Sequence, residues 1–379
     1  MADWKTHKAR CRPVVVREAS HGAGLALWSS RPLRVGERIL AESPLLLTHV
    51  ATSESGAKAA RTMLQLHMTA LTEEDRNKVL QFGDSHRAPD APPTLLGLAL
   101  TNQLPIAAAA PSATSSADSN LQRGAIFEYL CRAQHSCTPN SEYSWNQSLG
   151  QGVLHALRPI PAGTEITISY LSAVSQMSFE QRQQVMAEGF RFQCACETCE
   201  GQRGTSEAAL GLRAASDQRR LRAHDLLAAL MSPEMSAEPD RAQAVVASLE
   251  STLAAEGYPP PCSVLGRAYF RLFQIEITRS ALLDLAAKHI ARSVEIYTAC
   301  KGADSDVVKT YAPLVAAPQS HVDFACMDPV KPEAEAAAAA SSSSSSSKSS
   351  KQKKKGGNET KPQQQQQQQQ PQATSNASK

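Results

Sequence analysis

Three cysteines fall within six residues near the middle of the chain, in the run Cys194-Ala-Cys196-Glu-Thr-Cys199. Backbone turns at this spacing can direct three sulfur atoms at one centre, about 2.3 Å from a Zn²⁺ ion. The alternative is a chance grouping of small buried residues, because free cysteine packs in cores as a small hydrophobic side chain. A structural zinc ion takes four ligands, so the pattern predicts a metal site that needs a further donor from elsewhere in the chain.

The other cysteines bear on the choice between metal binding and disulfides. The chain has nine cysteines, an odd number, and it begins with a polar, basic segment that lacks the apolar stretch of a secretory signal. We therefore expect reduced thiols and a location in the nucleus, the cytoplasm or both. Cys131 and Cys137 lie in the segment that precedes the cluster, whereas the remaining cysteines are isolated in the sequence.

The charge distribution argues against some classes of partner. Residues 328–379 hold eight lysines against four acidic residues, so the rest of the chain is near −1 within a net charge of +3. Direct nucleic-acid binding by the folded part is not expected from this charge. No run of eighteen apolar residues occurs, so we expect no membrane span. The chain is expected to be a monomer.

The N-terminal half alternates between strand and helix patterns. Branched and apolar runs between turn signals predict strands in the first fifty residues, beginning with Val14–Val16. Residues 57–82 change to the apolar spacing of two short helices, the second opened by Thr72. Residues 107–120 contain mainly Ala, Ser and Pro, which predicts a loose surface insertion.

Two further strands are predicted before the cysteine cluster, at Gly152–Leu157 and Glu165–Tyr170. The second alternates cleanly and places Ile166, Ile168 and Tyr170 on one face. This pattern alone favours a core role for Tyr170 over a functional one.

The C-terminal half is predicted to be helical and then disordered. From Ser206 to Ala316 apolar residues recur at three- and four-residue spacing, which is typical of tandem helical hairpins. Beyond Asp328, runs of alanine, serine and glutamine cannot bury enough surface to offset chain entropy. The basic run Lys351–Lys355 is either a nuclear localisation signal or a solvated tail.

A histidine and a cysteine stand close together in Gln134-His135-Ser-Cys137-Thr-Pro-Asn140. Alone this is a weak signal for a nucleophile, because a catalytic cysteine also needs an oriented base. The segment is, however, one of four motifs that follow one another along the chain. They are Gly22-Ala-Gly24-Leu25, Gln134 to Asn140, Gly163-Thr-Glu-Ile-Thr-Ile-Ser-Tyr170 and Phe192-Gln-Cys-Ala-Cys-Glu-Thr-Cys199.

In this order the motifs resemble the SET-domain protein-lysine methyltransferases, most closely the SMYD-like branch, from about Cys11 to Gly201. The family signature Asn-His-Ser-Cys-x-Pro-Asn is matched with one departure, Gln134 in place of the first asparagine. The MYND zinc finger that interrupts the SET domain of SMYD proteins is missing, since residues 50–121 contain no cysteine. The chain is thus similar to shorter, fungal-type members without that finger.

The resemblance implies an α+β architecture. It places a β-rich SET domain with a pseudo-knot at residues 11–175, with an insertion at about 50–121. A zinc-binding post-SET segment is expected at 176–201, and an α-helical domain that roofs the substrate cleft at 206–316. A disordered low-complexity tail at 328–379 completes the expected organisation.

The resemblance also implies two cofactors, S-adenosylmethionine (SAM) and Zn²⁺. Cys137 would be the fourth zinc ligand, beside Cys194, Cys196 and Cys199. Glycine lets the main chain approach a ligand closely, so the Gly22–Leu25 backbone would cradle the methionine end of SAM. Phe192 would stack on the adenine ring. The cofactor-binding residues implied are Gly22, Gly24, Leu25, Asn102, Gln134, His135 and Phe192.

The implied reaction is methyl transfer to the side-chain amine of lysine in a protein substrate, a histone tail or another lysine-bearing protein. Most of the acceleration should come from alignment and electrostatics, and Tyr170 would orient the amine at the methyl group. Phe190 would line the lysine channel. Because phenylalanine lacks a hydroxyl group there, higher methylation states are favoured.

Two other functions compete with this one. A catalytically weak SET scaffold that binds zinc and recruits partners stays open, because Gln134 adds a methylene group where the family has asparagine. The presence of Tyr170 favours the enzyme, since a scaffold needs no tyrosine at the methyl-transfer position. A zinc-dependent DNA-binding protein is disfavoured, because no basic helix accompanies the cysteines.

Overall fold

The computed structural model describes residues 12–20, 24–51, 54–88, 90–106 and 121–328. Outside these ranges lie Gly22, the surface loop predicted at 107–120 and the tail predicted to be disordered. The residues up to Asp328 form one structural unit, and that unit is described below.

The strands of the described residues form four small sheets. A hairpin pairs β1 (Val14–Glu18) with β2 (Leu25–Ser29). One antiparallel sheet has the order β3 (Arg38–Glu42), β9 (Gln151–Ala156), β8 (Ser141–Asn146). Another has the order β4 (Leu46–Ala51), β6 (Leu121–Ile126), β5 (Leu104–Pro105). The fourth pairs β10 (Thr167–Ile168) with β7 (Gln134–His135) in parallel.

The strand predicted at residues 165–170 is much shorter in the structure. Its hydrogen bonds go to different partners in turn, because Ile166 N donates to Leu27 O at 2.8 Å whereas the next two residues pair with β7. The predicted buried face is nevertheless correct, since Ile166 and Ile168 are almost fully buried. The segment therefore joins the β2 hairpin to the 134–136 segment instead of extending one sheet.

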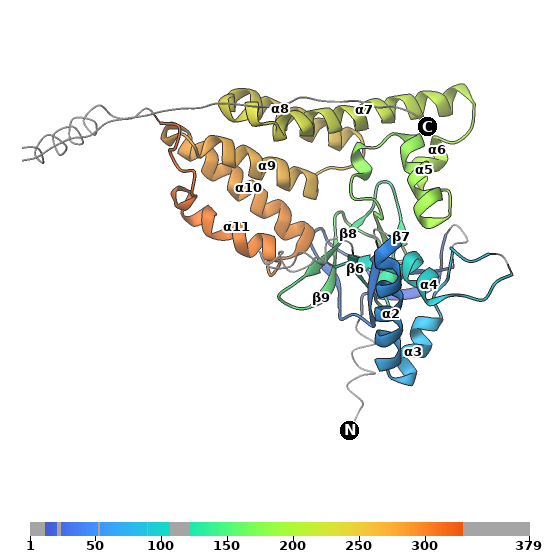
Figure 1. Ribbon diagram of the computed structural model, residues 1–379. Helices are drawn as coiled ribbons and strands as arrows, with labels where there is room; N and C mark the ends of the chain where they lie inside the picture. Colours follow the sequence, from blue (N-terminus) through green and yellow to red (C-terminus); the bar gives the residue numbers. More distant parts are fainter. Residues whose placement is uncertain (1–11, 21–23, 52–53, 89, 107–120, 329–379) are drawn as a thin grey trace, which may run out of the picture. The chain divides into compact units, whose positions relative to one another are not determined.

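The segment predicted to be an insertion carries three helices, which gather beside the strands (Figure 1): α2 (Glu54–Ala70), α3 (Glu73–Leu80) and α4 (Leu95–Asn102). The predicted start of α3 is confirmed, because the Thr72 side chain accepts a hydrogen bond from Asp75 N at 3.1 Å as an N-cap. The helix before it has 17 residues and is longer than predicted.

The prediction of a helical region after about Ser206 is confirmed. Helices α7 and α8 run along each other, and α9 packs against α10 (Figure 1). The α-helices from residue 179 onward are α5 (Phe179–Phe190), α6 (Glu197–Gly201), α7 (Glu207–Met231), α8 (Pro239–Ala255), α9 (Ser263–Glu276), α10 (Leu283–Lys301) and α11 (Asp306–Ala316). Short 3-10 turns lie at Leu130–Arg132, Val174–Gln176, Pro233–Ala237, Ser280–Leu282 and Pro318–Ser320. Within the described ranges, no helix is long and apolar enough to cross a bilayer.

The helical region is joined to the strands by polar contacts and by a shared core. Lys301 Nζ lies 2.9 Å from a carboxylate oxygen of Glu142 in β8, and Asn146 Nδ2 donates to Asp304 O at 3.1 Å. The cysteine cluster belongs to the same buried apolar cluster as Leu226 of α7 and Leu249 of α8. Helices and cysteine cluster are thus parts of one packed interior.

The buried histidine His155 in β9 should make the stability of the fold depend on pH. Its ring is 1% exposed, Nε2 accepts from Arg38 Nε at 3.3 Å, and Nδ1 has no hydrogen-bond partner among the described residues. Burial, with the charge of Arg38 next and that of Lys301 behind it, lowers the pKa of His155 to about 4, although Asp304 opposes the shift. A depressed histidine pKa gives stability that is complete above about pH 6.5 and is lost as the pH falls toward 4.

Between pH 7 and pH 4.5, His155 should therefore cost the wild type about 2–3 kcal/mol of unfolding free energy. His155→Gln keeps an acceptor for Arg38 but does not titrate. Urea unfolding at both pH values should show that the variant loses about 2–3 kcal/mol less unfolding free energy than the wild type does. Equal losses would contradict the assignment.

Candidate active site and metal centre

Cys137, Cys194, Cys196 and Cys199 are buried and bring their sulfur atoms within 4.8 Å of one another. The Cys137 sulfur lies 3.5 Å from that of Cys199 and 3.9 Å from that of Cys194. Sulfur atoms at the corners of a tetrahedron with Zn–S bonds of about 2.3 Å are about 3.8 Å apart. The four side chains therefore fit a structural zinc ion.

The structure distinguishes the two candidates for the fourth ligand. Cys131 lies in the turn at Leu130–Arg132, and its sulfur accepts a hydrogen bond from Phe127 N at 3.1 Å. Cys137 instead joins the three clustered cysteines, as the resemblance implies. Hydrogen bonds to the other three thiols, together with burial, raise the pKa of Cys137. Because buried thiolates repel one another, full deprotonation of this set requires a divalent cation.

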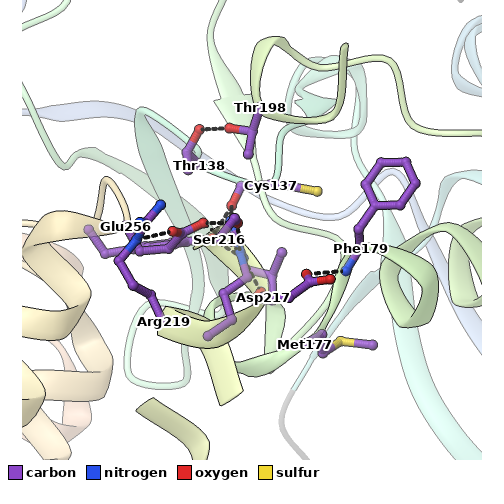
Figure 2. A network of polar contacts seen from close by, with 12 residues as sticks. Cys137, Thr138, Met177, Phe179, Thr198, Ser216, Asp217, Arg219 and Glu256 are labelled. Carbon is purple, nitrogen blue, oxygen red and sulfur yellow. Dashed lines mark hydrogen bonds and ion pairs between the residues drawn. The ribbon is translucent and has the colours of Figure 1, made fainter. Parts of the chain in front are cut away.

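Side-chain contacts hold the two cysteine-bearing loops in place. The Thr138 and Thr198 hydroxyl groups lie 2.8 Å apart and bridge the Cys137 loop to helix α6 (Figure 2). On α5, Gln183 forms a reciprocal pair with Cys194: Cys194 N donates to its side-chain oxygen at 3.0 Å, and its amide donates to Cys194 O at 3.1 Å. The loop geometry thus depends on hydrogen bonds as well as on the sulfur atoms.

His135 connects the cysteine cluster to Tyr170. Its Nδ1 accepts from Tyr170 N at 3.0 Å, and its Nε2 lies 3.4 Å from the Cys137 sulfur. Burial lowers the pKa of His135 to about 4, so Nδ1 remains a neutral acceptor. The neighbouring residue, Gln134, donates its side-chain amide to Leu25 O at 3.0 Å. Gln134, His135 and Leu25, three residues predicted to bind SAM, therefore lie close together, and His135 contacts Tyr170.

Tyr170 and Phe190 form an aromatic pair with ring centroids 5.2 Å apart. The Tyr170 hydroxyl donates to Ala133 O at 2.9 Å, and burial raises the pKa of Tyr170, so the phenol stays protonated. Both rings line a cavity of about 960 Å³. The wall of this cavity also includes the end of α4, residues of the loop between α8 and α9, and the start of α9.

The other residues predicted to contact SAM do not all lie at one place in the structure. Gly24 has φ +85°, which favours glycine, and a Cβ there would meet nothing within 4 Å. Leu25 is 46% and Phe192 39% exposed, so both leave apolar surface for a ligand. Asn102 lies instead on the cavity wall, where its amide donates to Gly83 O at 2.7 Å and to Leu98 O at 2.8 Å.

Asn140, to which the sequence interpretation gave no role, locks the active-site loops together. Its amide donates to Glu165 O at 2.8 Å, and its carbonyl oxygen accepts from Thr167 N at 2.9 Å. Ser141 Oγ donates to Thr167 O at 2.8 Å. The only available signal was the place of Asn140 at the end of the His-Ser-Cys motif.

Residues 24–171 match the family model of the SET domain. Histone-lysine N-methyltransferase set5 of Schizosaccharomyces pombe is 30% identical over 176 residues, which are 46% of this chain and 47% of that protein. Protein-lysine N-trimethyltransferase SMYD5 of Mus musculus is 35% identical over 83 residues, 21% of this chain and 20% of that protein. The chain thus spans about half, or less, of the curated relatives that it matches. Residues 24–171 are a SET domain, and the chain is related to the Set5 and SMYD protein-lysine methyltransferases.

Proposed function

We propose that this protein transfers a methyl group from SAM to the side-chain amine of a lysine in a protein substrate. The observation that carries the proposal is the position of Tyr170. Its backbone is hydrogen-bonded to His135, beside the Gln134–Leu25 surface, while its ring lines the cavity with Phe190. One residue therefore borders both the surface proposed for SAM and the cavity proposed for the lysine.

When bound, SAM supplies an electrophilic methyl carbon on a sulfonium. The neutral amine nitrogen of the substrate would form the new N–C bond as the C–S bond breaks, S-adenosylhomocysteine would leave, and the methylated ammonium would release its proton to solvent. The Tyr170 hydroxyl donates its proton to Ala133 O, so the phenol oxygen is free to accept a hydrogen bond from the amine and orient it. The half-buried aromatic walls at Tyr170 and Phe190 favour the neutral amine that the reaction requires.

Four cysteines, Cys137, Cys194, Cys196 and Cys199, would hold a Zn²⁺ ion with a structural role. Since Phe192 precedes Cys194 by two residues and His135 precedes Cys137 by two, metal binding would also shape the SAM surface. We further propose a histone tail or another lysine-bearing protein as substrate, a monomeric enzyme, and a location in the nucleus, the cytoplasm or both.

Transfer of label from SAM to a core-histone mixture and to a cell lysate tests the proposed activity directly. The alternative is a weak scaffold, favoured by Gln134, whose amide already donates to Leu25 O. Calorimetry distinguishes the two functions. SAM binding together with label transfer supports the enzyme, whereas zinc-loaded protein that gives no heat with SAM supports the scaffold.

Phe190→Tyr should shift the products toward monomethyl-lysine. The added hydroxyl would occupy space at the Tyr170 ring and offer a hydrogen bond to the amine, whose net value of about 1 kcal/mol corresponds to a change of roughly fivefold to tenfold in product ratio. Mass spectrometry of a methylated peptide measures the ratio. Phe179→Tyr, at the other end of α5 and off the cavity wall, is the matched control. A wild-type enzyme that makes only monomethyl product would contradict this role of Phe190.

A further inference from the structure

Arg220 in α7 is fully buried, and its guanidinium reaches two loops of the active site. Nη2 donates to Cys137 O at 3.4 Å, and Nη1 donates to Val174 O. Cys137 is a proposed metal ligand, and Val174 follows Tyr170 by four residues. A single side chain of the helical region therefore contacts the backbone of a proposed metal ligand and that of the segment after Tyr170.

Tyr258, in the loop after α8, contacts the same place. Its hydroxyl donates to Cys137 O and lies 3.4 Å from Arg220 Nη1. Glycine suits the close approach of this loop to Thr138, because Gly257 has φ +85° and an added Cβ would come within 3.3 Å of the threonine methyl group. The carbonyl of Cys137 thus accepts from two buried donors that both come from the helical region.

Glu256 holds Arg220 in position. It lies 2.8 Å from Arg220 Nε and 2.7 Å from Arg219 Nε, and Ser216 also donates to it. Figure 2 shows Glu256, Ser216 and Arg219 gathered beside Cys137. Arg220 and Glu256 thus form a buried ion pair, whereas the Arg219 side chain is 37% exposed and solvent screens its charge. Loss of Glu256 would leave the buried Arg220 unpaired, so Glu256 fixes the position of the guanidinium group.

We propose that Arg220, Glu256 and Tyr258 form a positioning network through which the helical region orients the metal ligand Cys137 and the loop after Tyr170. The helical region is then part of the metal and cofactor site, in addition to lining the substrate cavity. The catalytic consequence rests on the proposed methyltransferase function, whereas the effect on metal binding does not.

Tyr258→Phe removes only the hydroxyl that donates to Cys137 O, so it is the principal test. With Co²⁺ as the metal probe, thiolate-to-cobalt absorption in competition with a chelator should report about tenfold weaker binding, as is usual when a partner of a metal ligand is lost. Tyr269→Phe is the matched control. It also loses one phenol hydrogen bond, to Glu250 at 2.5 Å, but within the helical region and off the cavity wall.

Thermal unfolding midpoints should fall by similar amounts in the two variants, so a merely structural role predicts the same Co²⁺ affinity in both. Arg220→Lys keeps the charge opposite Glu256 but cannot reach both carbonyls, and it should weaken Co²⁺ binding further. Wild-type Co²⁺ affinity in Tyr258→Phe would overturn the proposal. Wild-type protein that binds Co²⁺ tightly but methylates nothing would refute the methyltransferase function alone.

Discussion

Replacing Tyr170 by phenylalanine should lower kcat for lysine methylation by about two to three orders of magnitude. This is the usual cost of removing one preorganised polar contact at a reacting centre. The Tyr170 hydroxyl is held by Ala133 O at 2.9 Å on the wall of the cavity, where it can orient the incoming amine. The dissociation constant of SAM should change by less than about threefold, because phenylalanine keeps both the backbone hydrogen bond to His135 and the ring, whose centroid lies 5.3 Å from that of His135.

Single-turnover methylation of the best protein substrate, with SAM calorimetry on the same protein, measures both quantities. Tyr269→Phe, which loses a phenol hydrogen bond to Glu250, should retain the wild-type kcat. A Tyr170→Phe enzyme as fast as the wild type would remove the proposed role of this hydroxyl.

Removing the metal should abolish SAM binding, with a rise in the dissociation constant of at least about a hundredfold. Without a cation, buried thiols at these distances lose their common centre, and the Cys137 loop is released from the 194–199 segment. That loop carries Gln134 and His135, and Phe192 lies just before the same segment. Calorimetry with SAM before and after chelation measures the loss, and far-UV circular dichroism checks that the helices persist.

Cys199→Ser should behave like the chelated protein. Cys300→Ser, at a buried cysteine outside the cluster, should keep the wild-type affinity for SAM and so controls for the substitution itself. Full SAM affinity in metal-free protein would show that the cluster only stabilises the fold.

Several features of this molecule follow from local patterns. The three-thiol run at 194–199, the N-cap at Thr72 and the helices after Ser206 depend on residues a few positions apart, and their spacing predicts them. The predicted strand at 165–170 was partly wrong for the converse reason. Alternation reports which face is buried but not how many partners share the hydrogen bonds.

The assembly of the site depended on contacts between distant segments. From the residues alone, either Cys131 or Cys137 could have been the fourth metal ligand, and the resemblance to SET-domain proteins favoured Cys137. In the structure, the turn at Leu130–Arg132 directs Cys131 toward Phe127, while Cys137 meets a loop almost sixty residues later in the chain. Likewise, an arginine in a helical pattern is usually on a solvated face. Arg220 is buried because Glu256, from the end of α8, reaches it.

Local spacing was therefore enough to predict the three clustered thiols, the helical C-terminal half and the motifs that mark residues 24–171 as a SET domain. Only the tertiary structure decided that Tyr170 borders both the His135 side and the cavity, and that Cys137 O accepts hydrogen bonds from Arg220 and Tyr258. Periodicity records the environment of each residue along its own helix or strand. Which buried donor meets which acceptor is decided when packing brings distant segments together and their polar groups must be satisfied.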